Sequence, residues 1–292
     1  MAKKFFDIAH ILVSLEILDE KLWGRISNLA PFEVGAASDP VLEFSQVEAL
    51  GEEEPEPLLV SDDKGFPRIT VAKTDRGEWF FTMAPLDDAP VSCRCICSED
   101  FSKARFEVLE RKHFAFSVNN AMMLVYALRT SSLGCLEIHA SVIMKDGKAV
   151  AFLGKSGTGK STHTRLWQEN IPDCELLNDD NPIVCCRPGG EVFICGSPWS
   201  GKTPCYKKKE VPLAAVVRLN QAPFNRIKKL SGIQAYAALY PSVSAYRPER
   251  KVADGIHDSI SKVAASVPCY NLECLPDGEA ALLSYSTVYG KG

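Results

Sequence analysis

Residues 151–167, AFLGKSGTGKSTHTRLW, bring glycines, lysines and hydroxyl side chains together in a spacing that suits an anion. Gly154, Gly159, Lys160 and Ser161 satisfy the pattern G-x-x-x-x-G-K-[ST]. Such a loop turns successive backbone N–H groups toward phosphate oxygens, and the positive end of a following helix adds to the attraction. Glycine is needed because the backbone must approach the anion closely. The pattern therefore predicts a site for a nucleoside triphosphate.

Residues 154–162 are the predicted phosphate-binding segment. Its members are Gly154, Lys155, Ser156, Gly157, Thr158, Gly159, Lys160, Ser161 and Thr162. Lys160 would reach the β- and γ-phosphates, and the Ser161 hydroxyl would bind Mg²⁺. The alternative is a glycine-rich turn that merely tightens a strand-to-helix corner, which accounts for neither the lysine nor the hydroxyl. We interpret His163, in the first turns of the predicted helix, as a packing or surface residue.

An acidic doublet, Asp179-Asp180, lies in the stretch CELLNDDNPIV, only 20 residues after Lys160. One helix and a return strand fill that interval. We therefore predict that the doublet ends a strand beside the strand of the glycine loop, with its carboxylates facing the triphosphate. The alternative is an Asp-Asp-Asn-Pro turn. The later loop GSPWSGKTP, which contains Lys202, could offer donors to a phosphate or an acidic substrate, and a plain turn explains it equally well.

The pattern of apolar and polar residues changes near residue 130, and this change divides the chain into two parts that must position these residues. Residues 1–130 are predicted to form a mostly β N-terminal domain, because the stretches 67–85 and 91–109 alternate apolar and polar residues between turn residues. The helix predicted within 116–134 links this part to residues 131–292. There a β-hairpin turning at 145–147 feeds into the glycine loop. The acidic stretch 50–65 is expected to be an exposed loop.

Composition limits the partners and the compartment. A net charge of −4 gives no general attraction for nucleic acid or an anionic membrane. Charged residues interrupt the apolar N-terminal stretch, so no segment is predicted to be a leader or to span a membrane. The eleven cysteines lack paired C-x-x-C spacings, and Cys93, Cys95 and Cys97 alternate as on one face of a strand. We interpret the cysteines as reduced thiols rather than metal ligands, in a cytoplasmic protein.

The stretch LEIHAS, placed just before the hairpin, completes a set of motifs that resembles the HPr kinase/phosphorylase family and its relatives. The resemblance covers residues 135–200, and GTGKS is also similar to the phosphoenolpyruvate carboxykinases. It implies an α/β (α+β) fold, with a carboxykinase-like P-loop nucleotide-binding core beside the smaller β domain. The family's working site is matched by His139, Lys160, Ser161 and Asp180. The interval of 21 residues from His139 to Lys160 is similar to the family's.

Two residues of the family's site, a glutamate metal ligand and a later arginine, have no clear counterpart in this sequence. Phe193 falls near the place of the family's glutamate metal ligand. Either Asp179 takes over the Mg²⁺, directly or through water and together with Ser161, or the metal site is built differently from the family's. The family's later arginine has three candidates: Arg218, Arg247 and Arg250. The resemblance also implies a homo-oligomer, and it leaves the acceptor open.

These residues predict an ATP-dependent kinase that transfers the γ-phosphoryl group to a hydroxyl of a protein serine or a small compound such as free serine. Asp180 would orient and deprotonate the acceptor, Lys160 would stabilise the phosphates, and His139 would hold the Asp180 carboxylate or the phosphate in place. ATP and Mg²⁺ are the expected cofactors. The alternatives are a nucleotide-binding regulatory protein that transfers nothing, and a carboxykinase-like lyase.

Overall fold

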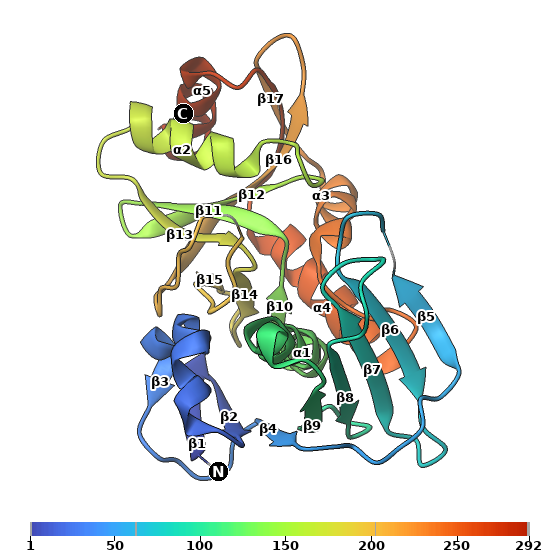
Figure 1. Cartoon of the computed structure of the whole chain (residues 1–292). Helices are drawn as coiled ribbons and strands as arrows, with labels where there is room; N and C mark the ends of the chain where they lie inside the picture. Colours follow the sequence, from blue (N-terminus) through green and yellow to red (C-terminus); the bar gives the residue numbers. More distant parts are fainter. Residues whose placement is uncertain (1, 62, 202, 291–292) are drawn as a thin grey trace. The chain divides into compact units, whose positions relative to one another are not determined.

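The protein is a mixed α/β fold with two large sheets, as the sequence predicts (Figure 1). The computed structural model describes residues 2–61, 63–201 and 203–290. It divides into two compact units, Met1–Arg129 and Thr130–Gly292, called here the N-terminal and C-terminal units. Each unit contains its own nine-stranded sheet. None of the helices in the described residues is long and apolar enough to cross a membrane.

The N-terminal unit consists mainly of a sheet with the strand order β3-β1-β2-β4-β9-β8-β7-β6-β5. Its strands are β1 (Ala2–Ile8), β2 (Ile11–Ile17), β3 (Glu33–Val34), β4 (Leu42–Val47), β5 (Pro57–Ser61), β6 (Arg68–Lys73), β7 (Trp79–Ala84), β8 (Cys93–Cys97) and β9 (Lys103–Val108). The three cysteines of β8 are all buried. The acidic stretch predicted as a loop contains β5, whose residues are all exposed. The segment becomes a strand through its antiparallel pairing with β6, and Val60 is its one strongly β-forming residue, so little in the local sequence indicated it.

Three helices complete this part of the chain: η1 (Glu20–Phe32), η2 (Arg111–His113) and α1 (Phe114–Ser131). The predicted linking helix is therefore confirmed as α1. Its buried side chains include Met122 and Tyr126. The Tyr126 hydroxyl donates to the Ile8 carbonyl at 3.0 Å, which fastens α1 to the first strand of the sheet.

The C-terminal unit has a sheet in the order β10-β14-β15-β16-β12-β11-β13, with β18 also paired to β16 and β17 paired to β18. Its strands are β10 (Cys135–Glu137), β11 (Ala140–Lys145), β12 (Lys148–Leu153), β13 (Glu175–Asp180), β14 (Ile183–Cys186), β15 (Val192–Cys195), β16 (Glu210–Gln221), β17 (Arg226–Lys229) and β18 (Cys269–Cys274). Antiparallel β11 and β12 confirm the predicted hairpin. Parallel β16 pairs with the other edge of β12.

The helices of this unit are α2 (Lys160–Asn170), α3 (Gly232–Leu239), η3 (Tyr240–Ser242), α4 (Arg250–Ser266) and α5 (Gly278–Tyr289). Helices α2 and α5 pack together over the sheet (Figure 1). Trp167 of α2 is fully buried in this core, together with Phe152 of β12 and Val217 of β16. This packing anchors the helix that follows the glycine loop.

The position of the acidic doublet corrects one prediction. Strand β13, which ends with the doublet, pairs with β11 and not with β12, the strand of the glycine loop. Both edges of β12 are already taken, since its hairpin partner β11 occupies one and β16 the other. The doublet therefore lies one strand further from the loop than expected.

Candidate functional site

The glycine loop, residues 154–159, connects buried β12 to α2. Gly159 precedes the helix with φ 101°, a backbone conformation that favours glycine. A Cβ on Gly154 would lie 3.1 Å from the Thr158 side chain, so any other residue would require Thr158 to shift by a few tenths of an ångström. No side chain caps the start of α2 among the described residues. The first N–H groups of the helix are therefore available to an anion held by the loop.

Lys160, the first residue of α2, places its ammonium group at the base of the loop. Its Nζ donates to the Gly154 carbonyl at 2.9 Å and lies 2.8 Å from His139 Nε2. The residue is only 8 % exposed. Burial lowers the pKa of Lys160, and the carboxylates of Asp180 and Asp179 oppose that shift. The acidic doublet thus helps to keep a buried cation charged.

His139 joins the lysine to the second aspartate. Its Nδ1 lies 2.8 Å from Asp180 Oδ1. An ammonium group can only donate, so Nε2 of a neutral His139 accepts from Lys160, and Nδ1 carries the proton that is donated to Asp180. The backbone N–H of His139 donates to the Ser242 carbonyl at 2.6 Å, which fixes the residue between β10 and β11. The result is a hydrogen-bonded line from Lys160 through His139 to Asp180.

A second pair lies beside this line. Ser161 Oγ donates to Asp179 Oδ1 at 2.9 Å, and Asp179 is 4 % exposed. Lys160 and Ser161 are neighbours on α2, and the two aspartates are neighbours at the end of β13. The structure thus brings together all five of the residues that the sequence assigns to catalysis and metal binding.

Asp180 is held in an unusual backbone conformation. Its φ is 137°, in the region that favours glycine. An isolated bridge pairs Asp180 with Ser200, and the Gly201 N–H donates to the Asp179 carbonyl at 2.6 Å. Asn181 Nδ2 donates to the second carboxylate oxygen of Asp180 at 3.2 Å. Strain of this kind persists only where the surroundings fix it, and it is concentrated at functional sites.

The sequence model of a family described as "SynChlorMet cassette protein ScmC" matches residues 106–280, more than half of the chain. The chain belongs to the ScmC family. The matched range contains every residue of the site described above, together with strands β10 to β18. No curated protein matches the chain.

One supporting residue within the ScmC-matched range escaped the sequence analysis. Asn178 is fully buried, and its Nδ2 donates to the Trp199 carbonyl at 3.0 Å. Its Oδ1 accepts from the Asn181 N–H at 3.0 Å. Asn178 therefore ties the loop that follows β15 to the turn after the doublet. The feature of the sequence that could have pointed to Asn178 is its position directly before the two aspartates. There its buried amide can hydrogen-bond to the backbone of the turn that follows them.

Glu137, at the end of β10, is a second residue that was missed. It is 1 % exposed, and neither carboxylate oxygen has a hydrogen-bond partner of normal geometry among the described residues. Burial raises the pKa of Glu137 well above its ordinary value; Ser244 opposes this effect and Asp180 adds to it. The shift favours the neutral form of this carboxyl, which lies two residues before His139 in the chain.

Other residues considered from the sequence lie in different places. Phe193 is on β15, where the Arg187 guanidinium sits 4.3 Å from its ring centre. Arg218 is the strand neighbour of Leu153, the residue before the glycine loop, whereas Arg250 pairs with Asp254 on α4. Lys202 lies outside the described residues.

Arg247 supports the backbone that holds His139. It donates to the carbonyls of Tyr240 and Val243, at 2.8 and 3.1 Å. Val243 forms an isolated bridge with Ile138, the residue before His139. Of the three arginines, Arg218 is thus paired in the sheet with the residue before the loop, and Arg247 contacts the segment that bridges to the residue before His139.

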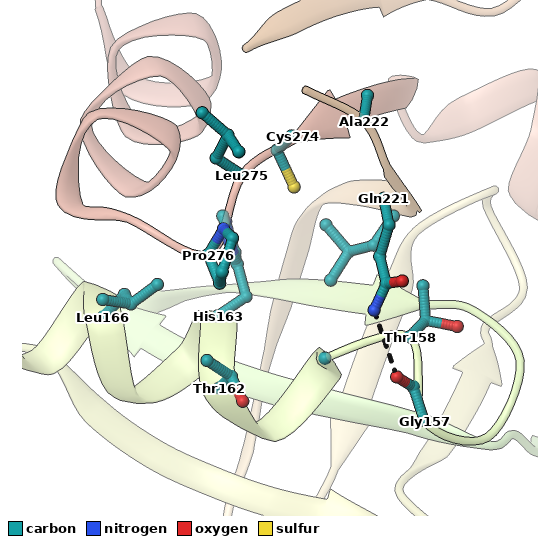
Figure 2. A pocket seen from close by; sticks show the side chains of 12 residues that line it. Gly157, Thr158, Thr162, His163, Leu166, Gln221, Ala222, Cys274, Leu275 and Pro276 are labelled. Atoms are coloured by element: carbon teal, nitrogen blue, oxygen red, sulfur yellow. Dashed lines mark hydrogen bonds between the residues drawn. The ribbon is translucent and has the colours of Figure 1, made fainter. Parts of the chain in front are cut away.

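A cavity of about 420 Å³ opens beside the glycine loop (Figure 2). Residues from the loop, from the start of α2, from the end of β16 and from the β18–α5 connection line it. Gln221 points across it, and its Nε2 donates to the Gly157 carbonyl at 3.4 Å. His163 lies in its wall, with Nε2 3.0 Å from Ser284 Oγ in the interface of α2 and α5.

Proposed function

We propose that the protein is a nucleoside-triphosphate-dependent kinase that transfers the γ-phosphoryl group to a hydroxyl. The observation that carries the proposal is the hydrogen-bonded line Lys160–His139–Asp180, which begins at the base of the glycine loop. A turn that only connected a strand to a helix would not require a buried ammonium group, an imidazole and a carboxylate that are hydrogen-bonded to one another. We also propose that the C-terminal unit has a carboxykinase-like nucleotide-binding fold.

The loop supplies the phosphate-binding part. Backbone N–H groups of the loop and of the first turn of α2 would hold the β- and γ-phosphates. Lys160 would exchange its contact with the Gly154 carbonyl for phosphate oxygens, because a charged acceptor makes the stronger hydrogen bond. Arg218, next to Leu153 in the sheet, could add a second positive charge at the edge of the loop.

Ser161 and Asp179 suit a magnesium ion. They offer a hydroxyl and a carboxylate oxygen 2.9 Å apart, and Mg²⁺ prefers oxygen ligands. The described residues contain no group of three or more His, Cys, Asp and Glu side chains arranged for a metal. Mg²⁺ commonly takes one or two carboxylates from the protein and completes its coordination with phosphates and water. When bound, Mg²⁺ would neutralise charge on the β- and γ-phosphate oxygens.

Asp180 would act on the acceptor. Its Oδ1 accepts from His139 and its Oδ2 from Asn181, so the carboxylate is fixed in orientation. The acceptor O–H would give its proton to Asp180, a new O–P bond would form to the γ-phosphorus, and the bond from that phosphorus to the leaving nucleoside diphosphate would break. The proton would then pass from Asp180 to solvent.

The test is incubation of the protein with γ-labelled ATP, Mg²⁺ and pools of free amino acids, sugars and cell proteins, followed by location of the label. We expect a phosphate ester on one class of acceptor, and no label when Lys160 or Asp180 is substituted. ATP binding without transfer to any pool would instead favour a regulatory nucleotide-binding protein. Nucleotide consumption that required oxaloacetate would favour the lyase.

A further inference from the structure

The cavity beside the glycine loop is continuous with the predicted phosphate site. Gly157, Thr158 and Gly159 belong to the loop and also line the cavity. A ligand whose phosphates lie on the loop would therefore direct the rest of its structure into this space. The volume of about 420 Å³ lies within the usual range of small-molecule sites, roughly 300–1,000 Å³.

The walls of the cavity are mostly apolar and carry no formal charge. The apolar lining residues are Leu166, Leu219, Ala222, Leu275 and Pro276. His163, the titratable imidazole in the wall, has its pKa lowered to about 4 by burial, so it is neutral near pH 7. Such walls suit the faces of a flat, uncharged heteroaromatic ring better than a sugar or a second anion.

Gln221 supplies a polar group at the edge of this space. Its amide lies at the end of β16, and Figure 2 shows it reaching toward Gly157. Nε2 donates to the Gly157 carbonyl at 3.4 Å, and the same amide carries an acceptor oxygen, Oε1. An amide oxygen is an acceptor, so it can take a hydrogen bond from an amino or ring N–H group at the edge of a base.

We propose that this cavity binds the purine base of the phosphoryl donor and that Gln221 hydrogen-bonds to the edge of that base. The inference rests on the proposed function, since it assumes that the glycine loop holds the phosphates. It goes further by placing the base of that donor in this cavity and by naming the side chain that contacts it. The phosphates would provide attraction, and the cavity would provide the preference for a purine.

The experiment compares ATP with inorganic tripolyphosphate, which has the phosphates but no base. Calorimetry would be done on the full chain with Mg²⁺ for the wild-type protein and three variants. Ala222→Trp fills the cavity from a half-buried position, and Gln221→Ala removes the exposed amide. Ala237→Trp makes the same substitution on the exposed face of α3, outside the lining, and serves as the control.

We expect the wild-type protein to bind ATP at least about 10-fold more tightly than tripolyphosphate. Ala222→Trp should weaken ATP binding by about 10-fold or more, and Gln221→Ala by about 3- to 10-fold. Both should leave tripolyphosphate binding unchanged, and the control should change neither ligand.

Two results would overturn the inference while leaving the phosphate site intact. One is equal affinity of the wild-type protein for ATP and tripolyphosphate. The other is unchanged ATP binding, or an equal loss of both ligands, in Ala222→Trp and Gln221→Ala. If the wild-type protein bound neither ligand, the proposed function itself would be wrong and the inference would fail with it.

Discussion

Lys160 and Asp180 contact opposite nitrogens of one imidazole, each at a distance of 2.8 Å. His139 thereby couples the side chain predicted to bind phosphate to the side chain predicted to take the acceptor proton. Because its Nδ1 proton is donated to Asp180, the ring orients the carboxylate without itself needing to change charge. The arrangement places an ammonium group and a carboxylate on opposite sides of one imidazole ring.

Lys160 should be the main side-chain contact of the triphosphate. We expect Lys160→Ala to reduce ATP affinity by about 10- to 100-fold, because it removes a charged hydrogen bond to the phosphates. Lys155→Ala is the matched control, since Lys155 is an exposed lysine of the same loop and the variant keeps its backbone. Calorimetry with Mg·ATP measures both. Equal effects of the two substitutions would mean that Lys160 has no special place in the site.

The Ser161–Asp179 pair should determine the requirement for magnesium. Ser161→Ala removes one of the two oxygen donors without creating a buried charge, so the Mg²⁺ concentration for half-maximal activity should rise several-fold. High Mg²⁺ should restore part of the lost activity. Gln168→Ala, at an exposed position of α2 outside the site, is the control. An unchanged Mg²⁺ dependence in Ser161→Ala would contradict the metal assignment.

His163 should make folding sensitive to acid. Its pKa is lowered from 6.5 to about 4, mainly by burial, so protonation is harder in the folded chain than in the unfolded chain. Its contribution to stability is therefore complete above about pH 6.5 and is lost as the pH falls toward 4. From the size of the shift, the loss is at most about 3 kcal/mol.

Urea unfolding at several pH values measures this effect. His163→Gln should show a shallower fall in unfolding free energy between pH 6.5 and 4 than the wild-type protein. His257→Gln changes an exposed histidine on α4 and should keep the wild-type slope. Parallel curves for wild type and His163→Gln would rule out the buried imidazole as the acid-sensitive group.

Local patterns in the sequence were enough to predict α1, α2 and the β11–β12 hairpin, because periodicity, glycine and turn residues act over a few positions. The neighbour of β13 was predicted wrongly, since strand order depends on which edges are free. Glu137 and Asn178 were missed for a similar reason. A strand residue with an ordinary polar side chain becomes part of a site only when distant segments bury it.

The most direct test of the proposed kinase is the substitution Asp180→Asn, measured for phosphoryl transfer and for Mg·ATP binding. The variant keeps the size of the side chain but cannot take the acceptor's proton. Transfer should therefore fall by about 10²- to 10⁴-fold, while Mg·ATP affinity changes far less. Asn181→Ala, which removes one hydrogen bond to the same carboxylate, should have a smaller effect on transfer. An unaltered transfer rate in Asp180→Asn would contradict the catalytic role of the Lys160–His139–Asp180 line.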